Sequence, residues 1–276
     1  MYELNQFQIL LLEHETTLRL FSFIFLILVF MGLELIRPRR LPDKANRTRR
    51  VNNILLLIVD IIAVRLLMPI AIFQVAVFAA DNNLGLFNIL PTPLFLNVIL
   101  TLIIFDCLIY LQHVITHKVN FLWQIHRVHH TDIAVDVTTG IRFHPFEIIF
   151  SMIYKIIAVL LLGPVAFAVI LYEILLNGAA LFTHSNILLN SKLDSALRVI
   201  FVTPDMHRIH HSMLRQETDS NFGNILSIWD KLFKTYRAVP AAGYDKMRLG
   251  LEEFCAPSSE QLIQLLKIPF LTADKL

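Results

Sequence analysis

Ten of the eleven histidines in this chain lie between positions 113 and 211, and nine of these ten follow a spacing that repeats. His113 and His117 are four residues apart. Two further clusters each read HxxHH, and His184 lies between them. The histidines of these two clusters are His126, His129, His130, His207, His210 and His211. Only His14 and His144 fall outside the pattern.

The spacing has a chemical meaning if these segments are helical. Residues three and four apart on a helix share a face, with Cβ atoms about 5–6 Å apart. Each HxxHH cluster then directs three imidazoles into one small volume. Imidazole is a ligand for zinc, iron, copper and nickel, and one such ion takes about four to six donors. Nine donors are too many for one ion, so the sequence predicts a dinuclear metal centre that uses all nine.

The elements that must position these histidines are apolar. Hydrophobic residues make up 56% of the 276-residue chain and charged residues 17%, which is too apolar for an ordinary soluble domain. This composition predicts an all-α integral-membrane protein. The net charge of +2 does not indicate a nucleic-acid partner. Cys107 and Cys255 are too few for a disulfide framework, so we expect two free thiols.

Several apolar stretches are candidates for membrane helices. The first contains 19 residues, which span about 28 Å as a helix and cover the hydrocarbon core. The last two flank Gly163-Pro164 and are each short for a crossing, so we expect a helical hairpin that need not cross fully. Residues 1–17 are expected to form a short interfacial helix. The apolar stretches are Leu18–Ile36, Val51–Ala80, Leu94–Leu111, Ile148–Leu162 and Val165–Leu181.

The loop from Arg37 to Arg50 sets the expected orientation. It contains seven basic residues and two prolines, and we expect a solvated, non-helical charge run. Short loops rich in Lys and Arg stay cytoplasmic, and the next loop, Asp81–Pro93, has neither. Counting crossings from this loop places all nine histidines on the cytoplasmic face. The predicted fold is a bundle of about four transmembrane or hairpin helices with a histidine-rich helical cap at that face, in the inner or plasma membrane if the protein is bacterial.

The C-terminal third carries the most specific residues. They read TPDMHRIHHS at 203–212, NFG at 221–223 and WDKLFKTY at 229–236. Together with the histidine series, this resembles the TPxxHRxHHS…NFG…WDxLFxTY signature of the fatty acid hydroxylase and sterol desaturase superfamily, which are integral-membrane metal oxygenases. The similarity covers about Phe95 to Tyr236. It implies an O2-dependent di-iron enzyme that acts on a lipid C–H bond, with the nine histidines as ligands.

The resemblance also implies partners and a domain organisation. Two iron ions are the expected cofactors, zinc is a possible substitute, and O2 is the co-substrate. No haem, flavin, dinucleotide or iron–sulfur motif is recognisable, so we expect a separate ferredoxin, cytochrome or reductase as electron donor. The substrate is expected to be a membrane lipid, whether fatty acyl, sterol-like or ether lipid, and hydroxylation and desaturation both stay open. Residues 1–93 would form the N-terminal membrane helices, 94–240 the catalytic domain and 241–276 a tail.

Two polar residues in apolar helices are candidates for supporting the site. Asp106 lies seven residues before His113, and Asn177 lies seven residues before His184. Each therefore shares a helix face with that histidine. An ionisable group in a membrane helix indicates function, so we expect both to face inward and Asp106 to orient an imidazole. The alternative is that Asp106 has a structural role and pairs with Asp60 or Arg65.

The segment around Arg142-Phe143-His144-Pro145-Phe146-Glu147 is a third candidate. His144 and Glu147 are predicted to support the metal ligands or to begin a helix, with Pro145 at its first position. A direct ligand role for His144 is the alternative. Four other residues are expected to be structural, positioning the loop after the second cluster or tying the C-terminal region to the bundle: Asp132, Asp136, Trp229 and Asp230.

Two other classes of protein use similar residues. A zinc-dependent membrane hydrolase or isomerase would use the same histidines, because zinc also binds imidazole. A transporter would place its ligands near the middle of the membrane, between inverted repeats. The predicted topology instead gathers the histidines at one face, which favours the oxygenase.

Overall fold

The structure is a computed structural model that describes residues 6–41, 46–90 and 92–271. Within these ranges the chain is helical, with isolated β-bridges and no β-strand. Five stretches are long and apolar enough to cross a membrane: Glu15–Ile36, Arg47–Ile89, Leu94–Lys118, Pro145–Leu162 and Ala166–His184. The prediction of an all-α integral-membrane protein is therefore confirmed, and the chain is multi-pass.

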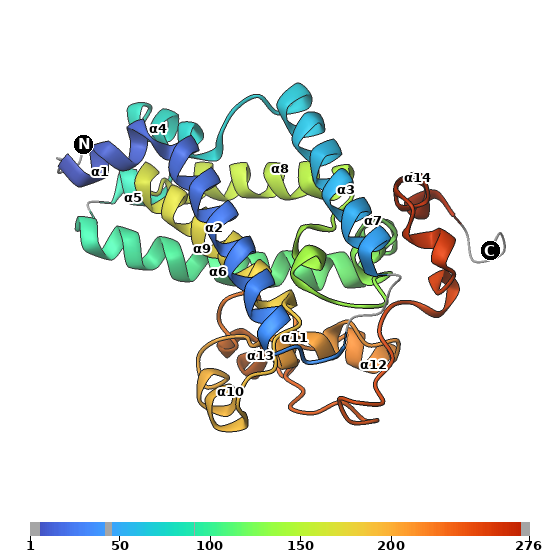
Figure 1. Ribbon diagram of the computed structural model, residues 1–276. Helices are drawn as coiled ribbons and strands as arrows, with labels where there is room; N and C mark the ends of the chain where they lie inside the picture. Colours follow the sequence, from blue (N-terminus) through green and yellow to red (C-terminus); the bar gives the residue numbers. More distant parts are fainter. Residues whose placement is uncertain (1–5, 42–45, 91, 272–276) are drawn as a thin grey trace.

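The membrane bundle lies above residues 185–250 in the view of Figure 1, and we call these residues the cap. The bundle comprises α1 (Gln6–Glu13), α2 (Glu15–Ile36), α3 (Asn46–Leu67), α4 (Ile72–Asp81), α5 (Leu86–Ile89), α6 (Leu94–Lys118), α8 (Pro145–Leu162) and α9 (Ala166–His184). The remaining helical elements are α7 (Asn120–His130), η1 (Val137–Ile141), α10 (Ser191–Leu197), α11 (Pro204–His210), α12 (Arg215–Thr218), α13 (Ile228–Leu232), η2 (Glu252–Phe254), η3 (Pro257–Glu260), α14 (Leu262–Lys267) and η4 (Ile268–Phe270). Figure 1 shows α1, α4 and α5 at one end of the bundle and α7 and α14 at the other.

The core of the bundle lies between α4, α6, α8 and α9. Phe105 on α6 meets Tyr172 on α9 edge to face, with ring centroids 5.4 Å apart. Ile72, Val159 and Val169 are buried in the same cluster. Lipid chains are as apolar as these side chains, so close packing rather than exclusion of water holds this region together.

Helices α8 and α9 follow one another around Gly163-Pro164 as predicted, but both pack against α4 and α6 rather than closely against each other. Both are also longer than the sequence suggested. His144 accepts a hydrogen bond from Phe146 N, and Pro145 occupies the first position of α8, where its missing N–H has no cost. Gly163 ends α8 with φ +63°, and a Cβ there would lie 2.6 Å from Leu84 O. Because α8 has 18 residues and α9 has 19, both are long enough to cross.

The second apolar run is divided rather than continuous. Helix α3 ends at Leu67 and α4 begins at Ile72. Pro69 lies between them, and proline lacks the N–H that would continue the helix and clashes with the preceding turn. At its other end, α3 begins at Asn46, inside the basic run that the sequence predicted to be non-helical.

The prediction that this basic run is solvated is wrong for several of its arginines. Arg49 is only 2% exposed and contacts Asp132, at 2.6 Å, and Asp136. Arg50 Nε donates to Asp136 Oδ2 at 2.6 Å. Arg40 donates to two backbone carbonyls between residues 244 and 247. Buried charge requires a partner, and here the acidic partners lie in the loop after the second histidine cluster.

The loop from 131 to 142 is a hub of buried polar contacts. Arg142 donates to Val128 O at 2.9 Å and to Asn53 Oδ1 at 3.1 Å, and it pairs with Glu260 near the C-terminus. Burial opposes ionisation of Asp132, but the positive charges of Arg49 and Arg142 hold its pKa at about 2. The acidic loop residues thus fix the loop, as predicted.

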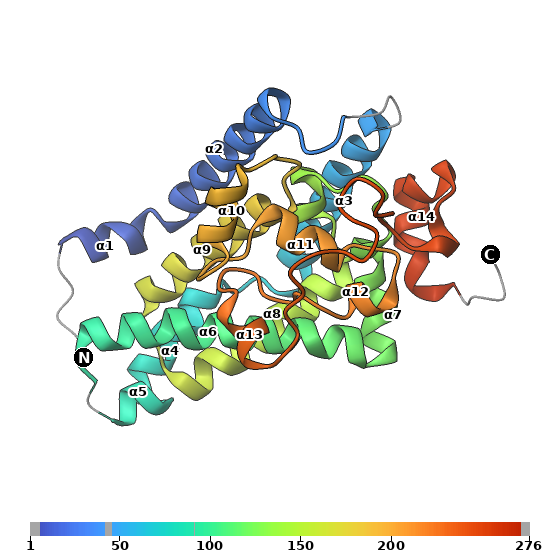
Figure 2. The same ribbon diagram turned by 90° about the horizontal axis from the view of Figure 1, so that it is seen from below.

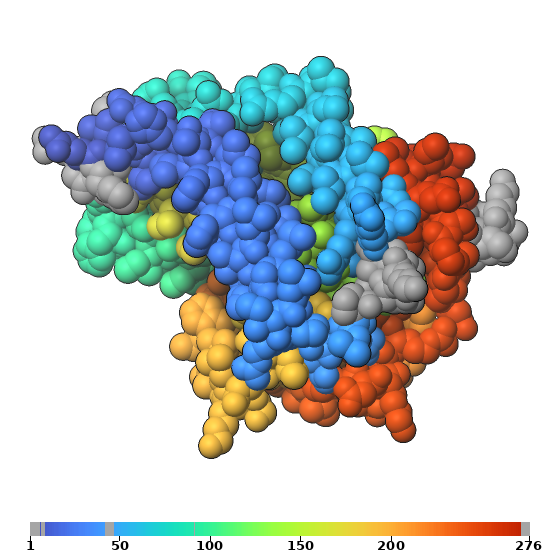
Figure 3. Space-filling model, in the orientation of Figure 1, coloured from blue at the N-terminus to red at the C-terminus, as the bar shows by residue number. Residues whose placement is uncertain are grey.

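The C-terminal segment closes the structure on this side. Leu265 and Ile268 are buried against Leu56 of α3 and Val128 of α7. Figure 3 shows the C-terminal residues packed beside α3. This segment has no sequence motif, yet it contributes Glu260 to the buried polar hub.

Replacing Arg49 with Ala should destabilise the protein by about 3–5 kcal/mol, because the buried carboxylates of Asp132 and Asp136 would each lose one of their positive partners. Thermal unfolding of the detergent-solubilised protein measures this as a lower midpoint. Arg47, two residues earlier on α3, is exposed, so Arg47→Ala is the matched control. Equal midpoints for the two variants would contradict the structural role of the buried pair.

Candidate metal centre

The nine predicted histidines converge into two adjoining groups. Within each group the candidate ligand atoms all lie within 4.8 Å of one another. We call these groups the five-histidine set and the four-histidine set. The five-histidine set is His113, His117, His126, His130 and His210. The four-histidine set is His129, His184, His207 and His211.

Helix geometry explains how the residues are divided. In each HxxHH cluster the first and last histidines are four apart and share a set, while the middle one belongs to the other set. On α7, His126 and His130 enter the five-histidine set, and His129 enters the four-histidine set. Residues at i+3 and i+4 lie on opposite sides of residue i around the helix. One cluster therefore serves two sites, rather than the single volume that the spacing suggested.

The two sets touch each other. His130 stacks on His211 with ring centroids 4.7 Å apart, and these rings belong to different sets. His210 and His211 are adjacent in the chain, also belong to different sets and have centroids 5.5 Å apart. This arrangement is a dinuclear one, with two neighbouring groups of donors.

Six of the nine rings have an acceptor at Nδ1, which fixes the tautomer. Because these acceptors can only receive a hydrogen bond, Nδ1 of each ring must carry the proton. In the neutral ring Nε2 then presents a bare lone pair. Four acceptors are backbone carbonyls and two are carboxylates. The Nδ1 contacts are His113 with Phe222 O (2.8 Å), His117 with Asp219 Oδ1 (3.3 Å), His126 with Glu147 Oε1 (2.6 Å), His129 with Arg142 O (3.2 Å), His184 with Ala180 O (2.7 Å) and His210 with Ser220 O (2.8 Å).

These tautomers bring lone pairs face to face. His113 Nε2 lies 3.1 Å from His126 Nε2, and His129 Nε2 lies 2.9 Å from His184 Nε2. Each of these four nitrogens is an acceptor, so neither pair can form a hydrogen bond. Four other Nε2 atoms are buried and have no partner in the described residues: those of His117, His130, His210 and His211.

A cation between these nitrogens relieves the repulsion and satisfies the orphaned acceptors. All-nitrogen donors of this kind suit first-row transition metals. The residues therefore fit a pair of metal ions.

Burial also keeps the clustered imidazoles in the form that binds metal. It lowers the pKa of His210 to about 3, because the charged ring would lose its hydration in the buried site. Burial likewise places the pKa of His129, His130 and His211 well below the usual value. Neutral imidazole is the ligating form, so these rings need no deprotonation near neutral pH.

Glu147 and His144 have different positions relative to the histidine sets. The Glu147 carboxylate contacts His126 Nδ1 at 2.6 Å, which is the kind of support expected from the sequence. His144 belongs to neither set. Its Nδ1 caps α8, and its Nε2 lies 3.4 Å from Leu266 O, so the structure gives it a capping role.

Asp106 and Asn177 do not meet the expectation that they face the metal ligands. Asp106 accepts from Trp229 Nε1 at 2.8 Å and from Leu226 N at 3.1 Å. It therefore holds the segment around α13 and pairs with neither Asp60 nor Arg65. Asn177 is exposed on α9. The helix face that the cap buries at His184 is left uncovered two turns earlier.

The NFG and WD parts of the signature form one structural unit, as expected for Asp230. Asp230 accepts from Phe222 N at 2.8 Å and from Gly223 N at 2.9 Å. A Cβ on Gly223 would lie 2.8 Å from Asp230 Oδ2, so only glycine allows this approach. The unit positions Phe222 O, the acceptor for His113. Sequence reasoning missed this role, because a backbone acceptor has no residue signature.

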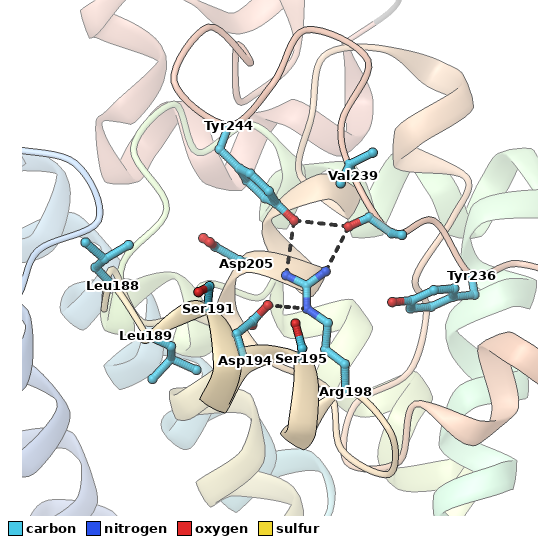
Figure 4. A pocket seen from close by; sticks show the side chains of 11 residues that line it. Leu188, Leu189, Ser191, Asp194, Ser195, Arg198, Asp205, Tyr236, Val239 and Tyr244 are labelled. Atoms are coloured by element: carbon cyan, nitrogen blue, oxygen red, sulfur yellow. Dashed lines mark hydrogen bonds and ion pairs between the residues drawn. The ribbon is translucent and has the colours of Figure 1, made fainter.

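A cavity lies in the cap, lined by residues of α10 and of the segment after α13 (Figure 4). Its volume is about 490 Å³. Arg198 projects into it, but its three nitrogens already contact Asp194, Ala238 O and Tyr244 Oη. Because each nitrogen of this guanidinium has a partner, the cluster ties α10 to the following chain.

The fold and the histidine sets define a multi-pass membrane protein with a dinuclear, all-histidine candidate metal centre. The profile of the fatty acid hydroxylase family matches residues 98–235, half of the chain and the region that contains all nine histidines. The chain belongs to this family.

Several curated relatives match about half of the chain. An ornithine lipid hydroxylase, OlsE of Rhizobium tropici, is 31% identical over 148 residues, which are 54% of this chain and 44% of that protein. Alkylglycerol monooxygenase of Homo sapiens is 33% identical over 129 residues, 47% of this chain and 28% of that protein. The chain therefore spans less than half the length of these relatives. Comparison with solved structures gave no significant match.

Removing one ligand from either set should release one of two bound ions. His130→Ala removes a donor from the five-histidine set, and His211→Ala removes one from the four-histidine set. Metal analysis of the purified protein should show a partial loss in each single variant and a complete loss in the double variant. A complete loss in each single variant would mean that the sets are not separate sites.

Glu147→Ala should weaken metal binding about 10–100-fold, because His126 would lose the partner that orients it. Glu147→Gln keeps an acceptor and should lose less. Competition with a metal chelator measures the change. Glu252 is exposed, so Glu252→Ala serves as the control and should bind metal like the unmodified protein.

Proposed function

We propose that this protein is an O2-dependent di-iron hydroxylase that oxidises a C–H bond of a membrane lipid. The observation that carries the proposal is the pair of buried histidine sets at the C-terminal ends of the apolar helices α6 and α9. Metal-binding imidazoles in this position can meet a substrate dissolved in the bilayer. The family to which the chain belongs supports the same reaction class.

The chain supplies the environment and the bound metal supplies the oxidation chemistry. A pair of iron ions, when bound, provides the O2-dependent oxidising power that no amino-acid side chain has. The two histidine sets hold nine imidazole donors in place. Glu147, Asp219 and four backbone carbonyls fix the Nδ1 protons, so that every oriented ring points Nε2 inward. Burial of the rings excludes water from the site.

The activities of the relatives narrow the proposed reaction. They are a hydroxylase of an ornithine lipid and monooxygenases of alkylglycerols. Both names describe insertion of oxygen, which favours hydroxylation over desaturation here. We therefore take the substrate class to be a lipid with a polar headgroup, whose acyl or alkyl chain presents the C–H bond.

Zinc is the alternative metal, because an all-nitrogen set also suits it. A zinc protein would be a hydrolase or isomerase and would need no electrons. The iron enzyme needs a separate electron donor such as a ferredoxin, a cytochrome or a reductase. The basic residues between Arg37 and Arg50 favour a cytoplasmic position for the metal centre, where such a carrier is available.

The test compares lipids from cells that express the unmodified chain or the double variant His129→Ala, His210→Ala, which removes one ligand from each set. Cells are grown under ¹⁸O₂. The unmodified chain should produce a lipid that carries one labelled oxygen atom, and the double variant should not. His14 is exposed and outside both sets, so His14→Ala is the matched control and should behave like the unmodified chain.

Two results would reject the proposal. Identical lipids in all cultures under aeration would show that the chain oxidises no membrane lipid. A modified lipid without ¹⁸O, together with zinc in the purified protein, would instead identify the hydrolase or isomerase.

A further inference from the structure

The segment that contains α13 lies against the middle of α6, not beyond its end. Asp106 is twelve residues from either end of α6, or roughly 18 Å along the helix. Its carboxylate accepts from Trp229 Nε1 at 2.8 Å. One turn further on, Tyr110 stacks on Phe233 with ring centroids 5.3 Å apart. Both ribbon views place α13 beside the middle of α6 (Figures 1 and 2).

The contact at Asp106 lies deeper along α6 than the histidines of the metal centre. Asp106 precedes His113 by seven residues, which is roughly 10 Å along the helix. Because α6 crosses the membrane, a group bonded to Asp106 lies toward the middle of the bilayer from the histidines. Part of the cap therefore lies beside α6, at the depth of the membrane-spanning part of this helix.

The same segment exposes a group of large apolar side chains, which we call the apolar shelf. Its members are between 45% and 64% exposed. Two short stretches form it, and they are joined by hydrogen bonds from Ser227 N to Ile200 O and from Val202 N to Ile225 O, both 2.9 Å. The members of the apolar shelf are Val199, Ile200, Phe201, Ile228, Leu232 and Phe233.

The apolar shelf continues a surface of α6 that faces lipid. Phe95, Ile99 and Ile103 follow one another at four-residue intervals on α6 and are between 42% and 68% exposed. Asp106 and Tyr110 lie further along the same side of the helix, where the segment from 226 to 235 covers them. The exposed stripe of α6 thus ends where the apolar shelf begins.

Basic side chains accompany this surface. Lys231 Nζ donates to Arg198 O and Val199 O, at 2.6 and 2.9 Å, beside the apolar shelf. Lys192 and Lys234 are exposed nearby in the chain. Lysines that flank an apolar surface match anionic headgroups above acyl chains. A soluble surface rarely exposes a contiguous apolar patch of this kind.

We propose that the apolar shelf is immersed in the lipid leaflet on the histidine side, in contact with phospholipid acyl chains. The cap is then a partly membrane-embedded unit rather than a wholly aqueous one. This inference concerns membrane placement and goes beyond the proposed function. It stands or fails independently of which metal or reaction the chain uses.

The test is nitroxide labelling in vesicles of phosphatidylcholine and phosphatidylglycerol. The full chain, with Cys107→Ser and Cys255→Ser, carries one new cysteine by Leu232→Cys. Ile99→Cys provides a lipid-facing reference, and Lys246→Cys provides an aqueous one, because that lysine is exposed in a polar loop. Collision rates of the label with O2, which concentrates in lipid, and with a water-soluble nickel chelate are measured by electron paramagnetic resonance.

The Leu232 label should collide more with O2 than with nickel, as at position 99 and opposite to position 246. Nickel access equal to that at position 246 would overturn the inference. Protection from both reagents, with dipolar broadening between labels, would assign the apolar shelf to a second copy of the chain and would also overturn it.

An independent readout covers the case in which the labelled variant does not fold. Trp229 is the only tryptophan left in a Trp123→Phe variant. Lipids brominated on their acyl chains should quench its fluorescence more strongly than aqueous iodide does. Quenching by iodide alone would reject the inference.

Discussion

The structure depends on one electrostatic constraint: acceptor nitrogens of neutral imidazoles face one another in a space closed to water. Glu147 and the carbonyls of Phe222, Arg142 and Ala180 accept hydrogen bonds from Nδ1–H groups. The inward nitrogens of these rings therefore carry no proton and cannot donate to each other. Without positive charge between them this arrangement is unfavourable. Most of the contacts around the centre therefore hold the donor nitrogens close together against their mutual repulsion.

The arrangement of helices follows from this constraint. The end of α6 brings His113 and His117 to the two histidine sets, and the end of α9 brings His184. The histidines of α7 and α11 complete the sets. The buried hub around Arg142 lies directly behind α7, since its guanidinium bonds Val128 O while its own carbonyl accepts from His129. Rigidity of the site and burial of charge are therefore parts of one network.

Much of this organisation could be read from the sequence, because the relevant signals are periodic. The histidine spacing identified all nine members of the two sets, and apolar length identified the membrane helices. The solvation of Arg49 and the inward position of Asn177 were predicted wrongly. Whether a charge is buried depends on carboxylates more than eighty residues away, as for Arg49 and Asp132, and local pattern contains no information about such partners. The carbonyl acceptors were equally invisible, because every residue type has a carbonyl.

The contact between Arg142 and Glu260 also has a consequence for biosynthesis. The backbone that orients His129 is braced by a side chain from far toward the C-terminus, so the brace is missing while translation is still under way. The nascent polypeptide therefore has imidazoles in the membrane before it has a finished coordination cage. Incorporation of the ions is expected to follow synthesis of this region rather than accompany membrane insertion, which leaves metal delivery as a distinct maturation step.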